Sequence, residues 1–134
     1  MRMLLPLVLA LAATSSLPAT GLSWSGGNAP VPFITITGTC PGPMTLTVSG
    51  ATPGGLVAML YGVPGSYTYP GTPCTGIVLG IINPNGTAPT LATTQTANSA
   101  GVLVINFNAP ASVCGLSVQA VDVASCTTSN IVTL

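Results

Sequence analysis

The sequence almost lacks charge. Its 134 residues include one basic side chain, Arg2, one acidic side chain, Asp122, and no histidine. Charged residues therefore make up 1% of the chain, against about 25% of an ordinary globular domain. General acid–base catalysis needs a tuned His, Glu, Asp or Lys, and nucleic-acid binding needs Lys and Arg to neutralise phosphates. We therefore expect no enzyme, no cofactor, no metal and no nucleic-acid partner.

The chain also lacks long apolar runs beyond its N-terminus. A membrane helix needs about 18 consecutive apolar residues, and here Thr, Ser, Gly, Asn or Pro interrupts every run after residue 13. Disorder is excluded as well, because hydrophobic residues make up 48% of the chain and disordered chains are poor in them. These features predict one folded domain with no membrane span.

The N-terminus has the layout of an export signal. Residues 1–13 (MRMLLPLVLALAA) place Arg2 before an apolar stretch that ends in small residues. This predicts a secretory signal peptide with an A-x-A cleavage site at residues 10–12; an uncleaved anchor helix is the alternative. Residues 14–30, rich in Ser, Gly, Pro and Ala, predict a flexible lead-in. The mature protein is therefore expected outside the cell or at its surface.

The four cysteines, Cys40, Cys74, Cys114 and Cys126, predict disulfides, because an even number in a small secreted chain forms a disulfide framework. Zinc binding is disfavoured by the absence of any C-x-x-C pair and of histidine. Of three connectivities, we expect Cys40 to pair with Cys74 at one pole of the fold, which leaves Cys114 with Cys126. The second pair requires the chain to fold back, because an extended strand between them would span about 20 Å.

Strand signals recur along the remaining chain, and helix signals are nearly absent. Turn clusters such as CPGP (40–43), TPGG (52–55) and NPNG (83–86) separate short runs of β-forming residues. About eight such runs at this spacing predict an antiparallel sandwich or barrel. We expect 56–61 to be covered on both faces and 91–96 to lie at an edge. The expected strands are 33–37, 44–48, 56–61, 76–82, 91–96, 102–107, 116–121 and 131–134.

Three motifs in this order carry a resemblance to a known family. They are SGATPGGLV at 49–57, ANSAG followed by an alternating strand and Pro110 at 97–110, and VQAVD with a later SN at 118–130. The order and spacing resemble those of bacterial immunoglobulin-like domains across residues 31–134. The resemblance implies a β-sandwich of about seven or eight strands, used as a spacer, adhesin module or surface component, and no catalysis. The four cysteines are typical of only some secreted members.

Few side chains are candidates for a binding site. Asp122 could be a calcium ligand with the help of Asn130, because calcium binds carboxylate and carbonyl oxygens. We favour the alternative that the side chain of Asp122 caps the turn after its strand. The segment 62–75 is the longest without a strand pattern, and long loops are often functional. Aromatic faces can stack on sugars, so Tyr61, Tyr67 and Tyr69 are the candidate ligand contacts. Tyrosines that simply pack over the end of a sandwich are the alternative.

The sequence thus predicts a secreted, non-enzymatic immunoglobulin-like β-sandwich with a structural or surface-interaction role. Its uncharged surface offers little repulsion between copies, so self-association or binding to other extracellular proteins is expected. A carbohydrate-binding module that uses the tyrosine-bearing segment 62–75 is the alternative. Thr-x-Thr at 35–37 and 45–47 is interpreted as solvent-facing strand residues rather than an ice-binding ladder, because the chain has no fixed internal repeat.

Overall fold

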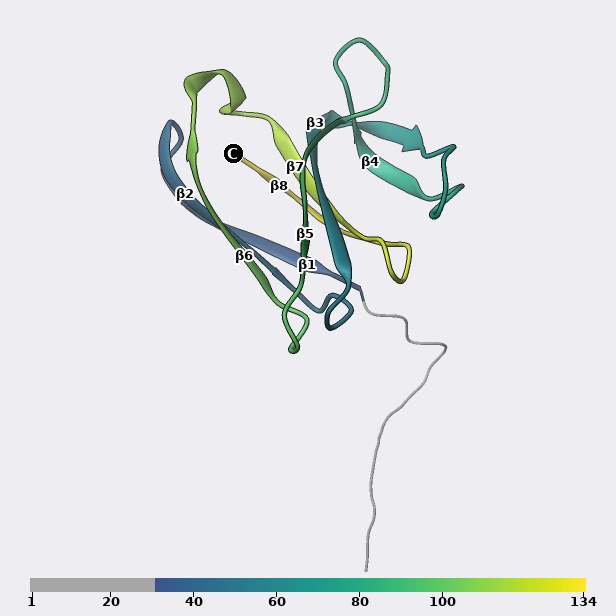
Figure 1. Cartoon of the computed structure of the whole chain (residues 1–134). Coiled ribbons are helices and arrows are strands. Elements are labelled where there is room, and N and C mark those ends of the chain that lie inside the picture. The colour runs from purple at the N-terminus through teal and green to yellow at the C-terminus, as the bar shows by residue number, and fades with distance from the viewer. Residues whose placement is uncertain (1–30) are drawn as a thin grey trace, which may run out of the picture.

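A computed structural model describes residues 31–134. The expected signal peptide (1–13) and lead-in (14–30) lie outside the described residues. The described chain forms two antiparallel β-sheets, and its one helical segment is a 3₁₀ turn at Ala111–Val113 (Figure 1). The expectation of an all-β, two-sheet fold is confirmed. The eight strands are β1 (Phe33–Gly38), β2 (Gly42–Ser49), β3 (Leu56–Thr68), β4 (Val78–Ile82), β5 (Thr90–Thr96), β6 (Leu103–Ala109), β7 (Ser117–Asp122) and β8 (Thr127–Thr133).

The smaller sheet has the strand order β1-β2-β6. Alternation along β2 buries Met44, Leu46 and Val48 and leaves the threonines between them half-buried on the other face. β1 follows the same rule, with Ile34 fully buried. Because successive strand side chains point to opposite faces, this sheet has one apolar inner face and one outer face on which hydroxyl and amide side chains predominate, with Phe33 and Val104 among them.

The larger sheet is built around β3. Its first half pairs with β7 on one edge and with β5 on the other, and its second half pairs with β4. β8 completes this sheet beside β7. The inner faces of both sheets meet in one core, to which β3 contributes Val57 and Met59 and β7 contributes Val118 and Ala120. All four cysteines of the chain, and so both disulfides, lie within residues 31–134.

β3 is longer than the sequence pattern indicates. The segment expected as a loop, 62–75, begins with seven residues that continue β3, and only 69–77 connect it to β4. Gly62 and Pro64 look like strand breakers, yet a side chain at Gly62 would collide with the backbone of Ile82. Glycine therefore serves here to let β4 approach closely. The pairing shifts register between Pro64 and Tyr67, and Figure 1 shows the end of β3 swinging away from the sandwich.

The strand that is covered on both faces is β7, rather than 56–61. All six residues of β7 are buried, whereas Leu56 of β3 is 43% exposed. On one face β7 packs into the inter-sheet core, and on the other Gln119 lies under β4, where its side-chain oxygen accepts a hydrogen bond from the Gly80 N–H (2.9 Å). The Gln119 amide also donates to the Ser129 carbonyl (3.0 Å), so this buried polar side chain has partners at both ends.

Both disulfide pairings expected from the sequence are wrong. Cys40 pairs with Cys114, and Cys74 pairs with Cys126. The swing of β3 is the reason: it carries Cys74 away from the β1–β2 connection and toward the β7–β8 turn, where the Val123 carbonyl lies 3.4 Å from its sulfur. The β1–β2 and β6–β7 connections meet at the opposite pole and join through the other pair.

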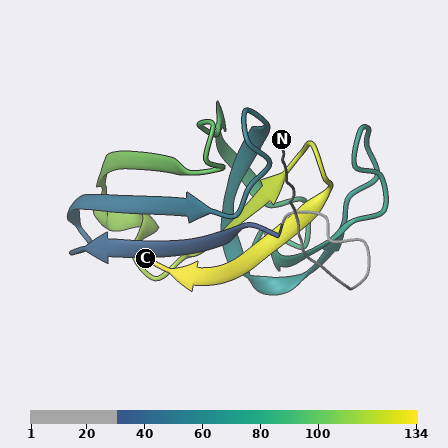
Figure 2. The same ribbon diagram turned by 90° about the horizontal axis from the view of Figure 1, so that it is seen from below.

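A side chain closes the seam between β1 and β8, the two outer strands on one side of the sandwich. The Asn130 side chain accepts a hydrogen bond from the Ile34 N–H (2.8 Å) and donates one to the Ile34 carbonyl (3.0 Å). Figure 2 shows β8 running beside β1. The amide therefore pairs with the backbone of β1 as a further strand would, and it links the two sheets on this side.

Candidate functional site

Asp122, the one acidic residue, joins two turns of the fold through hydrogen bonds of its side chain. Its side chain is fully buried. One carboxylate oxygen accepts hydrogen bonds from the Thr52 N–H (2.7 Å) and the Thr52 hydroxyl (2.8 Å), and the other accepts from the Ala124 N–H (3.1 Å). The bond to Ala124 is the predicted cap of the turn after β7. The bonds to Thr52, which join this turn to the β2–β3 turn, were not predicted.

The calcium alternative has no support in this geometry. The carboxylate of Asp122 is engaged by three donors, and the amide of Asn130 is engaged by Ile34 on the β1 side of the sandwich. Among the described residues no cluster of three His, Cys, Asp or Glu side chains forms. The carboxylate oxygens of Asp122 and the side-chain oxygen of Asn130 therefore act as hydrogen-bond acceptors within the fold.

The three candidate tyrosines do not form one site. Tyr61 packs against the core between the sheets. Tyr67 is half-buried in the β3–β4 ladder, opposite Leu79. Tyr69 is 37% exposed and lies at the hairpin tip, where its N–H donates to the Ile77 carbonyl (2.9 Å). Two of the three are thus strand residues, and a sugar site built from all three together is not formed.

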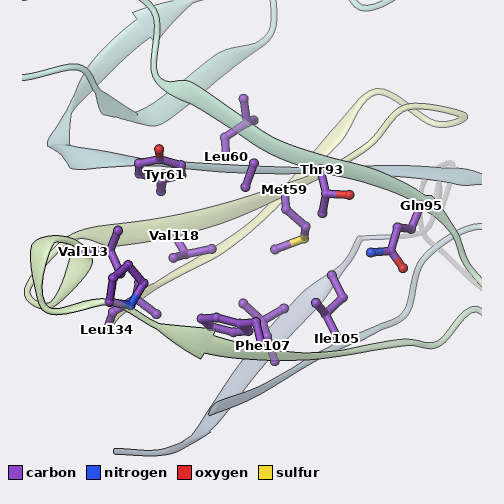
Figure 3. Close-up of a pocket in the computed structure, with 13 residues that line it drawn as sticks. Met59, Leu60, Tyr61, Thr93, Gln95, Ile105, Phe107, Val113, Val118 and Leu134 are labelled. Atoms are coloured by element: carbon purple, nitrogen blue, oxygen red, sulfur yellow. The ribbon is translucent and has the colours of Figure 1, made fainter. Parts of the chain in front are cut away.

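An apolar cleft of about 360 Å³ opens between the two sheets. Its base is formed by buried core residues, among them Leu46, Met59 and Val118. Figure 3 shows Met59 and Tyr61 of β3 facing Ile105 and Phe107 of β6 across the open space. The remaining lining residues come from β3, from β5, from the β6–β7 connection and from the last residue of the sequence: Leu60, Ala92, Thr93, Gln95, Pro110, Val113 and Leu134.

The cleft lies between two strands that each leave one edge unpaired. Within residues 31–134, β6 pairs only with β2, and β5 pairs only with β3. Figure 1 shows β5 and β6 diverging from the turn that joins them. A free strand edge presents a row of backbone N–H and C=O groups that can pair with another chain. The sequence predicted the edge position of β5 and gave no sign of the cleft, because the cleft depends on how far the two sheets splay apart.

A second apolar pocket, of about 300 Å³, lies on the outer face of the larger sheet. The β3–β4 hairpin covers one side of it with Tyr69 and Pro73, and β5 covers the other with Leu91. Gly71 lies close to the hydroxyl end of the Tyr69 ring, because a Cβ atom at that position would be 2.9 Å from the hydroxyl oxygen. Tyr69 therefore lines the pocket beside Gly71 and is 37% exposed.

The outer face of the smaller sheet carries uncharged polar groups together with the exposed apolar residues Phe33 and Val104. The strand register sets Thr35 beside Thr47 and Thr37 beside Thr45, and the hydroxyl of Thr45 donates to the side-chain oxygen of Asn106 (2.8 Å). These threonines lie on the solvent-facing side, as predicted. Large apolar side chains are also exposed over the described surface: Val31, Phe33, Leu56, Tyr69, Val78, Leu91, Val104 and Ile131.

The two disulfides are typical of a protein that folds in an oxidising, extracellular-type compartment. None of the helical segments in residues 31–134 has the length and hydropathy to cross a membrane. No protein-family model matches the sequence, and no curated protein or solved structure matches the chain.

Proposed function

We propose that this chain is a secreted, non-enzymatic immunoglobulin-like domain with a structural or surface-interaction role, and that copies of it associate with one another. The observation that carries this proposal is the pair of free strand edges, β5 and β6, on a molecule whose only charged side chain outside the signal segment, Asp122, is fully buried. Proteins normally protect such edges with charged side chains or proline. Neither β5 nor β6 contains Lys, Arg, Asp, Glu or Pro.

The strand order supports the immunoglobulin-like assignment. In the constant-type fold the first, second, fourth and fifth strands share one sheet, and the third, sixth and seventh share the other. Here β1-β2-β6 correspond to the first, second and fifth strands and β3-β7-β8 to the third, sixth and seventh. The chain departs from that fold in that β4 and β5 both pair with β3, so the smaller sheet has no equivalent of the fourth strand. The motifs that resemble the family fall at the corresponding positions: 49–57 spans the β2–β3 turn and 97–101 spans the β5–β6 turn. A two-sheet sandwich of this order needs no catalytic residues.

Buried Asp122 supports the non-enzymatic part of the proposal. A general base must be accessible to the proton that it abstracts, whereas this carboxylate is 0% exposed and accepts three hydrogen bonds. The chain contains no histidine or lysine that would activate one of its many hydroxyl groups. The two disulfides and the export-like N-terminus support secretion.

Sedimentation velocity of the secreted chain tests the proposal. We expect the mean sedimentation coefficient to rise between micromolar and millimolar protein, with little dependence on salt, because no surface charge is available to be screened. Val104→Lys, on exposed β6, should suppress the rise by adding charge beside the free edge. Thr35→Lys, on the opposite strand of the same sheet, is the matched control and should not. A strict monomer at every concentration would refute the proposal.

Carbohydrate binding is a second candidate because Tyr69 lines the apolar outer pocket and is 37% exposed. An exposed aromatic ring beside an apolar pocket can stack on the apolar face of a sugar. A glycan array tests this: wild type should bind a defined glycan, Tyr69→Ala should abolish binding, and half-buried Tyr67→Ala should retain it. Binding of no glycan by the wild type would end this candidate.

A further inference from the structure

The inter-sheet cleft has the shape and surroundings of a site for an extended peptide. Its volume, about 360 Å³, falls at the small end of protein ligand pockets. It is bordered on one side by the free edge of β6 and on the other by that of β5. A strand that entered between them could pair its backbone with an edge and direct alternate side chains onto Met59 and Val118. The most suitable occupant is therefore a segment that alternates apolar and polar residues and carries no charge.

The chain itself contains such a segment before the described residues. Between the expected signal peptide and Val31, Leu22 and Trp24 alternate with Ser23 and Ser25. In an extended strand the two large apolar side chains share one face, and the serines share the other. Leu22 and Trp24 are the bulkiest residues of 14–30 in this register, and Trp24 is the only tryptophan in the protein.

The start of the described chain lies beside the β2–β3 and β5–β6 turns. The carbonyl oxygen of Val31 is 2.8 Å from the place that a Cβ atom at Gly50 would take. The next residue, Ala51, donates its N–H to the carbonyl of Gly101 in the β5–β6 turn (3.1 Å). Trp24 lies seven residues before Val31, and seven extended residues can span about 23 Å, which is long enough to reach a neighbouring molecule.

The position of Val31 favours a neighbouring molecule over the chain's own cleft. Val31 adjoins β1, which is separated from β6 by the full width of the smaller sheet. Val31 also precedes a proline, and a residue before proline prefers extended conformations, which disfavours a reversal of the chain at this residue.

We propose that the β5–β6 cleft of one copy binds residues 20–25 of a second copy as an added strand, with Leu22 and Trp24 filling the apolar space. This inference rests on the proposed self-association and names the surfaces that form it. Because the inserted segment and the cleft are different surfaces, each copy can insert its segment into the cleft of one neighbour and bind the segment of another neighbour in its own cleft. Such head-to-tail contacts generate open chains of molecules rather than closed dimers.

The test compares the mature chain (14–134), its Leu22→Ser and Leu17→Ser variants, and residues 31–134 alone, which contain the described strands, the core that they enclose and both disulfides. Leu17 lies on the opposite face from Leu22 in an extended segment, so its substitution is the matched control. Sedimentation gives the association constant, and emission from Trp24 reports burial of the inserted segment alone. We expect association with a blue shift of the emission, weakened about tenfold or more by Leu22→Ser and unchanged by Leu17→Ser.

Residues 31–134 alone should stay monomeric and should bind a synthetic peptide of residues 19–27, with the same blue shift. Equal association of the mature chain and of residues 31–134 would overturn this inference and leave the proposed self-association intact. A monomer in both cases would overturn both. A monomeric mature chain whose Trp24 emission is already blue-shifted at every dilution would show the segment in its own cleft, which contradicts binding to a second copy.

Discussion

The carboxylate of Asp122 offers the sharpest test of how the fold is held together. Replacing it by alanine removes the acceptor shared by the Thr52 N–H and hydroxyl and the acceptor of the Ala124 N–H. The β2–β3 turn and the β7–β8 turn would then lose the side chain that joins them. Asp122→Asn is the milder change, because an amide oxygen can still accept from Thr52 while its NH₂ group faces the N–H of Ala124.

The expected cost follows from the partners left behind. A hydrogen bond to a charged group contributes about 1.5–3 kcal/mol, and a buried donor left unpaired costs about 1–3 kcal/mol. Two of the three bonds share one oxygen and one residue, so they are not additive, and Ala124 is exposed enough for water to replace its partner. We expect Asp122→Ala to lower the free energy of unfolding by about 3–4 kcal/mol and the Tm by about 10 °C or more. Asp122→Asn should cost about 1–2 kcal/mol.

Urea unfolding with the disulfides intact gives these values if the slope m is unchanged between variants. Thr52→Val removes only the hydroxyl donor and should cost about 1 kcal/mol. In that background Asp122→Ala should cost less than it does in the wild type, since one of its partners is already gone. A cost of less than about 0.5 kcal/mol for Asp122→Ala, which is typical of an unimportant surface change, would refute the structural role.

Three further outcomes follow from the fold. Replacing Cys40 and Cys114 by serine should lower the free energy of unfolding by about 4 kcal/mol, because the bond closes a loop with a sequence separation of 74; a peptic digest without reductant should yield these two residues in one linked fragment. Asn130→Ala should lower the free energy of unfolding by about 1–2 kcal/mol and speed amide hydrogen exchange at Ile34, because both hydrogen bonds between the two residues are lost. Unchanged exchange at Ile34 would contradict the link between β1 and β8. Gly62→Ala should cost about 1–3 kcal/mol in urea unfolding, because the new methyl group collides with the backbone of β4, and a neutral substitution would contradict that close approach.

The sequence predicted the strands whose side chains alternate between core and solvent. Met44 to Val48 illustrates this: each apolar residue is buried and each threonine between them is not. The extension of β3 past Gly62 was missed because glycine and proline there are used for close approach and a bulge, and local patterns cannot separate those uses from a loop. Because the sequence pattern ends this strand at residue 61, it places Cys74 at the wrong pole of the fold. Both predicted disulfide pairings are wrong for this reason.

The candidate site shows the same limit. The cap formed by Asp122 is local and was predicted, whereas its bonds to Thr52 join residues 70 positions apart and depend on the packing of two sheets. A threonine in a tight turn and a lone acid at a strand end are the only signals that could have indicated that contact. The inter-sheet cleft leaves no local signature, because its lining comes from five strands, the β6–β7 connection and Leu134, which are far apart in the sequence.

The most direct test of the central claim, association through the free strand edges, is amide hydrogen exchange measured on the secreted chain at low and high protein concentration. If copies associate through these edges, exchange should slow with rising protein concentration in β5 (Thr90–Thr96) and β6 (Leu103–Ala109), whose outer edges are unpaired. Exchange in β7 (Ser117–Asp122), which is already paired on both edges, should not change. Exchange rates in β5 and β6 that are the same at every protein concentration would contradict association through these edges.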